Sequence, residues 1–271
     1  MTTPLNPPTD VRPELLEAIR DTAADIARTL RSCTDTTVPI LGAEWTVGEA
    51  AAHLVVANEL MATLAAGQEQ SYGDGTAASL AAANAESLAG FGERDATVLL
   101  EGIVRHAQAF ADAAARRPAT EPTVTPLGPM DLGALGAYLL THMMGHGYDI
   151  AVALRQPHMV DRERVELALP FLMTGMPRIV DERTAAGFSA RYALRLRGGS
   201  RFAVTFDEGV VTVSAEPTGR TDCTIMLEPV AFLLLALGRC SPASVIARGK
   251  IVAWGRKPWL APRFPGFFKA P

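Results

Sequence analysis

The chain has 271 residues, of which 48% are hydrophobic and 20% charged, so it can bury a substantial core in one large domain or two modest ones. A formal net charge of −4, with no Lys/Arg-rich run among aromatic residues, argues against a nucleic-acid partner. Three cysteines without paired spacing and a polar, proline-rich start indicate a cytoplasmic protein. No membrane partner is expected, because the most apolar run, 230–237, is too short to cross a bilayer.

The first half of the chain carries the signals of helices. Apolar residues recur at helical spacing over 13–31, which predicts an amphipathic helix that needs partners. Thr46 and Glu49 form a T-x-x-E capping box, which predicts a second helix running to about residue 64. Ala-rich sequence over 77–91 and 96–115 predicts a third helical stretch, divided or bent near Gly90.

A fourth helix is expected over 132–154, with Asp131 as its cap, after a proline-rich crossover at 118–130. Four such helices predict a bundle. The pattern changes past Pro157, so we expect a bundle domain over 1–157 and a second domain over 158–271.

The second domain reads as a mixture of strands and helices. Residues alternate in character over 192–196 and 202–206, and short turns join these runs to 210–216 as an antiparallel meander. A further strand at 223–227 precedes an apolar helix over 229–239. This order predicts an α+β domain with a sheet covered by helices.

Histidines give the strongest functional signal in the chain. His142 and His146 lie one helical turn apart, which points both rings off one helix face. A transition metal usually takes three protein ligands when one position stays open for chemistry, and His53 on the second helix is the best third candidate. The sequence therefore predicts a metal site on these three residues. Zinc is preferred, although nickel, iron and copper accept the same donors.

Further candidates surround this site. Asp149 shares the helix stripe of the histidine pair and is a candidate to orient a metal-bound imidazole. Trp45 and Tyr138 are candidates to line a pocket. Arg239 and Arg256 in the second domain are candidates to bind a substrate carboxylate, with a solvated helix or strand end as the other interpretation.

Three segments, WTVGEAAAHL, GHGYDIA and LLLALGRCSPASVIARGKIVAWG, occur in an order that resembles the mycothiol-dependent maleylpyruvate isomerase family. The resemblance implies a DinB-like metal-binding four-helix bundle followed by a C-terminal domain similar to sterol carrier proteins. It also implies that His53 and His146 are metal ligands. The ligand one turn earlier looks like a Glu in the isomerase itself, whereas His142 stands here. A neutral imidazole in that place raises the charge of the site and makes the metal a stronger Lewis acid, which favours a metal site but not the isomerase reaction.

The leading hypothesis is a zinc-dependent enzyme that activates the thiol of mycothiol, a cosubstrate implied by the resemblance. The thiolate would add to an electrophilic small molecule, in an isomerase or an S-transferase. Three alternatives stay open: a thiol-independent metalloenzyme of natural-product tailoring, a carrier of an apolar ligand through the second domain, and three imidazoles that only form hydrogen bonds. The protein is expected to be a monomer or a homodimer.

Overall fold

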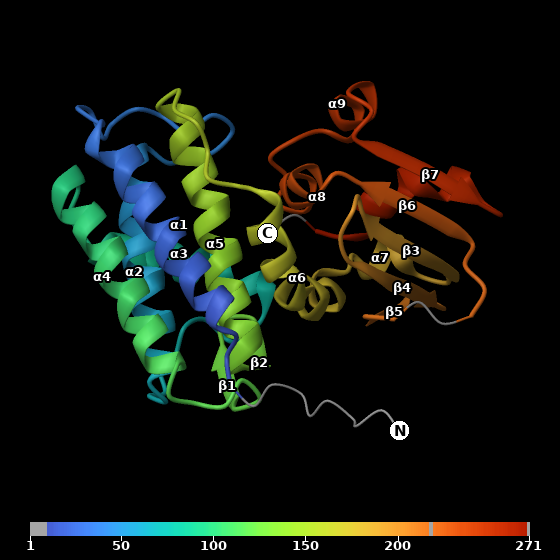
Figure 1. The fold of residues 1–271 in the computed structure, drawn as a ribbon, viewed down its shortest axis with the longest axis horizontal. Coiled ribbons are helices and arrows are strands. Elements are labelled where there is room, and N and C mark those ends of the chain that lie inside the picture. Colours follow the sequence, from blue (N-terminus) through green and yellow to red (C-terminus); the bar gives the residue numbers. More distant parts are fainter. Residues whose placement is uncertain (1–9, 217–218, 270–271) are drawn as a thin grey trace. The chain divides into compact units, whose positions relative to one another are not determined.

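The computed structural model describes residues 10–216 and 219–269, and it divides into two compact units, Met1–Val160 and Asp161–Pro271 (Figure 1). Most of the proline-rich start lies outside the described residues. Among the described helices, none is both long and apolar enough to cross a membrane. The predicted fold class, a helical bundle followed by an α+β domain, is confirmed.

The first unit is built on four long helices that pack together as a bundle. They are α1 (Pro13–Arg31), α2 (Val47–Ala65), α4 (Ala96–Ala114) and α5 (Leu132–Ala153). The turn η1 (Ala77–Ser79) and the helix α3 (Leu80–Gly90) precede α4, so the predicted third helical stretch is divided. Apolar stripes meet at the bundle centre, where Ile19, Ile26, Leu99, Ile103 and Phe110 are fully buried.

Side-chain caps fix where α2 and α5 begin. The backbone N–H of Thr46 donates to the Glu49 carboxylate over 2.7 Å, and the Glu49 N–H donates to the Thr46 hydroxyl over 3.3 Å. The Asp131 carboxylate accepts from the Ala134 N–H at the start of α5. Each cap is worth about 1 kcal/mol. The helices that carry the predicted histidines therefore have defined starts.

Residues 118–130, expected as a plain crossover, contain a hairpin at one end of the bundle (Figure 1). Its antiparallel strands are β1 (Pro122–Thr125) and β2 (Gly128–Asp131). Proline has no N–H to donate, but each strand of a two-stranded ribbon has an outer edge that needs no donor. Pro122 and Pro129 are therefore compatible with this pairing, and the predicted crossover contains a hairpin that the sequence analysis did not predict.

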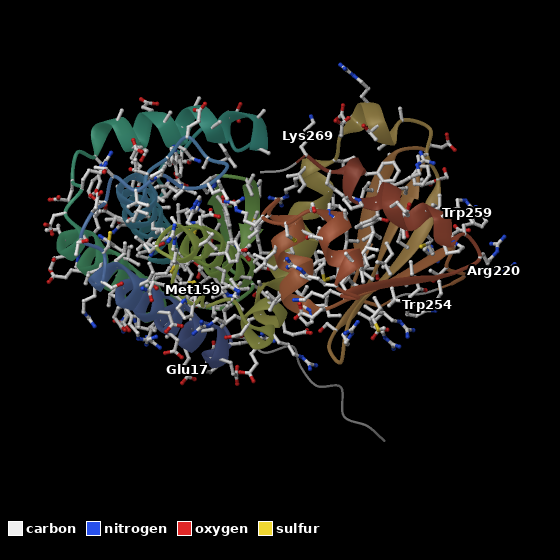
Figure 2. The ribbon with its side chains drawn as sticks, turned by 90° about the horizontal axis from the view of Figure 1, so that it is seen from above. Glu17, Met159, Arg220, Trp254, Trp259 and Lys269 are labelled. Carbon is white, nitrogen blue, oxygen red and sulfur yellow. The ribbon has the colours of Figure 1, made fainter. Side chains whose placement is uncertain are left out.

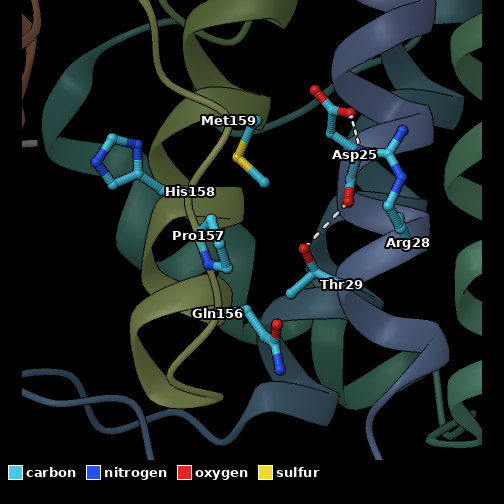
Figure 3. A pocket seen from close by; sticks show the side chains of 7 residues that line it. All are labelled: Asp25, Arg28, Thr29, Gln156, Pro157, His158 and Met159. Atoms are coloured by element: carbon cyan, nitrogen blue, oxygen red, sulfur yellow. Dashed lines mark hydrogen bonds and ion pairs between the residues drawn. The ribbon is translucent and has the colours of Figure 1, made fainter.

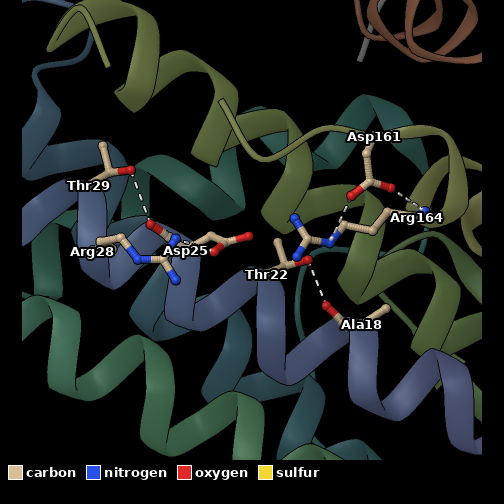
Figure 4. A network of polar contacts seen from close by, with 7 residues as sticks. All are labelled: Ala18, Thr22, Asp25, Arg28, Thr29, Asp161 and Arg164. Carbon is tan, nitrogen blue, oxygen red and sulfur yellow. Dashed lines mark hydrogen bonds and ion pairs between the residues drawn. The ribbon is translucent and has the colours of Figure 1, made fainter. Parts of the chain in front are cut away.

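Two buried hydroxyls lie on α1 without breaking it (Figure 4). Thr22 donates to the carbonyl of Ala18 over 2.7 Å, and Thr29 donates to the carbonyl of Asp25 over 3.1 Å. Bonding to the carbonyl four residues earlier satisfies a polar group inside an apolar interface. Helix α1 can thus keep both hydroxyls on the face that packs in the bundle.

Helices α1 and α5 pack closely at Gly147. A Cβ added there would lie 2.8 Å from Cγ1 of Ile26 and 2.8 Å from the sulfur of Met159. We expect Gly147→Ala to lower the free energy of unfolding by about 1–3 kcal/mol, because Ile26 is fully buried and cannot move away. Urea denaturation measures this loss. Gly133→Ala on the same helix is the matched control, since its Cβ would meet only contacts of 3.4 Å or more, and an unchanged Gly147→Ala would contradict the close packing.

The second unit is organised around a five-stranded mixed sheet (Figure 1). In chain order its strands are β3 (Ala190–Leu196), β4 (Arg201–Asp207), β5 (Val210–Ser214), β6 (Cys223–Leu227) and β7 (Ile251–Gly255). They lie in the order β5-β4-β3-β6-β7, with the predicted antiparallel meander β3-β4-β5 confirmed. Glu208 and Gly209 both have positive φ, as a two-residue type I′ hairpin turn requires. Strand β6 is parallel to β3, and β7, which the sequence did not reveal, is antiparallel to β6.

Helical segments complete this unit. They are α6 (Arg162–Gly175), η2 (Met176–Ile179), α7 (Glu182–Ala185), α8 (Pro229–Ala236), α9 (Pro242–Ala247) and η3 (Pro258–Phe267). Asp161 caps α6 through the Arg164 N–H at 2.9 Å and lies 3.6 Å from the Arg164 guanidinium (Figure 4). The ring of Phe267 packs 4.7 Å from that of Phe206 between centroids. This aromatic contact holds η3 against the sheet.

Candidate metal centre

The three predicted histidines lie together in the first unit. His53 comes from α2, and His142 and His146 come from α5. One side-chain nitrogen from each lies within 4.8 Å of the others, and Nε2 of His53 is 2.9 Å from Nε2 of His142. The two helices thus bring three imidazoles to one point, and we call this group the histidine cluster.

Burial determines the charge of the cluster's innermost member. His53 is 3% exposed, and desolvation lowers its pKa from 6.5 to about 4. The ring is therefore neutral at pH 7. At 2.9 Å the two Nε2 atoms can share one proton, which one ring donates and the other accepts. With both Nε2 atoms unprotonated, their lone pairs can instead bind a common cation.

The donor set of the histidine cluster fits a divalent transition metal. Three nitrogen donors with further positions open are the ligand set of many catalytic zinc sites, and imidazole also suits nickel, copper and iron. A ligand histidine must be neutral, so the lowered pKa of His53 means that no proton has to leave that ring near neutral pH. His53, His142 and His146 would hold the ion.

Aromatic rings enclose the histidine cluster. The Trp45 ring lies 5.7 Å from that of His146 with 28° between the planes, and 4.9 Å from that of His53. Tyr138, one turn before His142, lies 6.4 Å from it nearly at right angles. Burial raises the pKa of the Tyr138 phenol, so this side chain stays neutral. These rings restrict the motion of the imidazoles and keep water from part of the cluster.

Truncating Trp45 should loosen the histidine cluster without removing a nitrogen donor. We expect Trp45→Ala to weaken metal binding by about tenfold, the lower end of the effect of residues that orient metal ligands. Competition with a chromophoric chelator measures the affinity. Trp259→Ala is the matched control, since Trp259 is 66% exposed in the second unit (Figure 2). Equal affinities in the two variants would show that the stacking on His146 does not orient it.

Asp149 lies beside the cluster, as its place on the helix stripe predicted. Its Oδ2 is 3.7 Å from Nδ1 of His146. This separation exceeds a direct hydrogen bond, but at this range a carboxylate attracts the positive end of an N–H. A proton held on Nδ1 leaves the Nε2 lone pair of His146 for the cluster. This position is compatible with the predicted role of Asp149 in orienting His146.

The two predicted arginines lie in the second unit, where each has contacts within that unit. Arg239 is in the turn between α8 and α9, and its guanidinium donates to the carbonyl of Leu237. Arg256 follows β7 and lies 3.5 Å from a carboxylate oxygen of Asp222. These contacts fix local turns and assign neither arginine a substrate.

The other two histidines are outside the cluster. His106 is on α4, where its ring nitrogen lies 3.3 Å from the Arg105 guanidinium. His158 lies beside a small polar pocket of about 230 Å³ in the first unit, opposite Arg28 and Thr29 of α1 (Figure 3). Its ring packs 5.1 Å from that of Tyr148. These contacts make His158 a suitable control for substitutions in the cluster.

Comparisons with known proteins agree with this division of the chain. The family model of the mycothiol maleylpyruvate isomerase N-terminal domain matches residues 9–151, and that of the MDMPI C-terminal domain matches residues 166–262. A solved structure of a histidine-to-alanine variant of the mycothiol-dependent maleylpyruvate isomerase is 15% identical, with a TM-score of 0.51, and the match covers 89% of this chain and 91% of that one.

Two other solved structures are less similar. A second structure of the mycothiol-dependent maleylpyruvate isomerase is 15% identical over 84% of this chain and 90% of that one, with a TM-score of 0.47. A stereoselective inverting sec-alkylsulfatase from Pseudomonas sp. is 14% identical, with a TM-score of 0.33, over 98% of this chain and 33% of that one. No curated protein matches the sequence significantly. At 15% identity the match with the TM-score of 0.51 shows the fold alone.

Proposed function

The chain belongs to the mycothiol maleylpyruvate isomerase family, and from this premise we propose that it is a metal-dependent enzyme that activates a low-molecular-weight thiol. The observation that carries the proposal is the histidine cluster, in which three ring nitrogens lie within 4.8 Å of one another. Zinc is the proposed metal and mycothiol the proposed thiol. The second substrate is an electrophilic small molecule.

The residues of the site divide the work as follows. His53, His142 and His146 would hold the ion, Asp149 would favour the His146 tautomer with its proton on Nδ1, and Trp45 would limit ring rotation. A bound divalent ion lowers the pKa of a coordinated thiol, so that thiolate is present near neutral pH. Because its three protein ligands are neutral, the site keeps the full charge of the ion, which stabilises an anionic ligand.

The reaction class follows from thiolate chemistry. The thiolate would add to an electron-poor carbon of a double bond in the substrate, and the π electron pair would move to the activating group beside it. If the adduct is protonated and kept, the product is a thioether and the enzyme is an S-transferase. If the adduct rotates about the former double bond and expels the thiol, the enzyme is a cis-trans isomerase.

Cobalt substitution tests the proposal without knowledge of the substrate. The full chain is purified without an affinity metal, loaded with Co²⁺ and titrated with mycothiol. We expect a thiolate-to-cobalt absorption band and the release of a proton, both lost in His146→Ala and retained in His158→Ala. Cysteine is the thiol control, and it should require a higher concentration to produce the same band.

Each other outcome rules out a part of the proposal. Stoichiometric cobalt binding with no band on addition of mycothiol would favour a thiol-independent metalloenzyme. Failure of the folded chain to bind cobalt or zinc would exclude a metal enzyme. A band that persists in His146→Ala would show that the metal binds outside the histidine cluster.

A second candidate function, binding of an apolar ligand, is favoured by a cavity inside the second unit. The cavity has a volume of about 350 Å³ and is lined by apolar residues from the sheet, α6, η2, α8, α9 and η3. Leu194, Ile225 and Ala253 form part of its floor, and Phe232 and Phe264 part of its walls. A concave apolar site of this size suits a small hydrophobic molecule.

Organic extraction of the purified chain tests this second function. We expect an apolar compound to be released in a fixed ratio to protein and identified by mass spectrometry. Ala253→Phe should reduce its amount, because the added ring fills the cavity. An extract from the natively folded chain that contains no apolar compound, together with no uptake of added hydrocarbon ligands, would exclude the second function.

A further inference from the structure

Charge is divided unequally between the two units. The first unit, Met1–Val160, contains 19 Asp and Glu against 9 Lys and Arg, whereas the second, Asp161–Pro271, contains 10 Asp and Glu against 16 Lys and Arg. The formal net charges are therefore −10 and +6, which together give the −4 of the whole chain. Each unit of one copy is thus attracted electrostatically to the opposite unit of another copy.

The basic unit exposes arginines on one face of its sheet. Side chains alternate between two faces along a strand, and Leu194 points into the apolar cavity, so its neighbours on β3 point to the opposite, outer face. The strand register aligns Arg201, Arg195, Met226 and Val252 across the outer face of β4, β3, β6 and β7. Both arginines are exposed. Positive charge is therefore presented to solvent in the middle of the sheet.

Arg195 and Arg201 are directly opposite each other on adjacent antiparallel strands. The Cβ atoms of such a pair lie about 4.5–5.5 Å apart, and like charges in this arrangement destabilise a sheet. In the described part of the chain neither guanidinium forms an ion pair, and Glu216, beyond the end of β5, pairs with neither. A partner with negative charge would offset this repulsion.

Apolar surface lies next to the arginine pair. Val252 is 46% exposed, and Trp254, two residues further along β7 on the same face, is 41% exposed (Figure 2). Ala193 and Ala203 occupy the neighbouring row with short side chains. A small molecule binds best in a concave site, so an exposed sheet face of this kind suits the surface of a protein partner better.

Helix α1 of the acidic unit carries the complementary charges. Glu14, Glu17 and Asp21, spaced by three and four residues, form one exposed stripe along this helix (Figure 2 labels Glu17). None of the three forms an ion pair in the described residues. Residues at these spacings have Cβ atoms about 5–6 Å apart. This separation matches that of the arginine pair, so two carboxylates of the stripe can face two guanidiniums.

We infer that a second copy of this chain docks its helix α1 against the outer face of the sheet, with Glu17 and Asp21 facing Arg195 and Arg201. The contact forms charge-assisted hydrogen bonds and relieves the repulsion between like charges on both surfaces. Each copy carries both surfaces, as a two-fold dimer requires. The inference does not depend on the proposed function, because neither surface contains a residue of the histidine cluster or of the apolar cavity.

Sedimentation velocity of the full chain tests the inference. Over about a hundredfold range of protein concentration at low salt, we expect monomers to convert to dimers. Added salt should raise the dissociation constant by more than about tenfold, because exposed charges make the contact. A chain that stays monomeric at low salt would overturn the inference. A dimer that is insensitive to salt would also overturn it, because its interface would not be one of charges.

Charge reversal tests which residues meet. We expect the double variant Arg195→Glu, Arg201→Glu to remain monomeric, and likewise the double variant Glu17→Arg, Asp21→Arg. A mixture of the two should form a mixed dimer, because the sheet of the first and α1 of the second are again opposite in charge. Failure of the mixture to associate, with both variants folded by thermal melts, would contradict the contact.

Two further variants separate the contact from general effects of charge and folding. The double variant Arg183→Glu, Arg248→Glu changes the charge of the same unit equally at exposed positions outside the outer sheet face, and it should keep the dimer. Arg201→Glu alone puts opposite charges across β3 and β4, so it should fold at least as stably as the unchanged chain and still weaken the dimer by about tenfold. Loss of the dimer in the control, or full association of Arg201→Glu, would overturn the inference. Binding of an acidic peptide by a chain that stays monomeric would assign the sheet face to another partner.

Discussion

His146→Ala is expected to reduce bound metal from about one equivalent per chain to nearly none. The substitution removes one of three nitrogen donors that lie within 4.8 Å of one another. A pair of imidazoles holds zinc far more weakly than three, and we expect the affinity to fall by more than about a hundredfold, beyond the effect of residues that only orient ligands. Elemental analysis after dialysis against zinc measures the content, and chelator competition measures the affinity.

The chain offers a matched control for this experiment. His158→Ala removes the same side chain from the same unit, but His158 packs against Tyr148 outside the cluster. It should keep its metal. Loss of metal from both variants would point to unfolding or to another site, and retention by His146→Ala would contradict the three-histidine centre.

A substitution at Asp149 distinguishes a residue that orients a ligand from a ligand itself. Asp149→Asn keeps the shape of the side chain and removes its charge, so it should lower metal affinity by about tenfold rather than abolish it. A graded series, in which His146→Ala has the larger effect, would separate a ligand from a residue that orients one. Equal losses would make the carboxylate a direct partner of the ion.

Local patterns predicted the helices of the bundle because an apolar stripe marks α1 and cap residues mark the starts of α2 and α5. The Thr46 and Glu49 pair and the Asp131 cap are formed as the sequence indicated. The hairpin over 122–131 was missed because its prolines read as loop residues, and nothing local shows that their strands pair at an outer edge. Strand β7 was missed because its few residues pair with β6 across a long separation in sequence.

Local sequence likewise predicted one part of the candidate site and not the other. Spacing on one helix predicted that His142 and His146 share a face, and the capping box placed His53 inside a helix. The stacking of Trp45 on His146 joins positions far apart in sequence, so no spacing could show it. The cavity of the second unit is also a property of packing, since periodicity tells which face Leu194 and Ile225 occupy but not whether another side chain fills the space above them.

The metal-free protein is expected to lose stability as the pH falls from about 6.5 to about 4, with a total loss of about 3 kcal/mol from His53. Burial lowers the pKa of His53 in the folded chain to about 4, against 6.5 for an ordinary histidine. Above pH 6.5 the ring is neutral in both states, and the full stability is present. Below pH 6.5 His53 binds a proton in the unfolded chain but not in the folded chain, so the free energy of unfolding falls. It stops falling below about pH 4, where His53 is protonated in the folded chain too.

Urea denaturation at a series of pH values, with a chelator present throughout, measures this dependence without a contribution from metal release. His53→Gln removes the titrating group, so its stability should vary less with pH over the same interval, whatever its absolute value. His158→Gln should keep the slope of the unchanged chain. A His53→Gln variant with the full slope would show that other groups cause the pH dependence and that burial does not lower the pKa of the His53 ring.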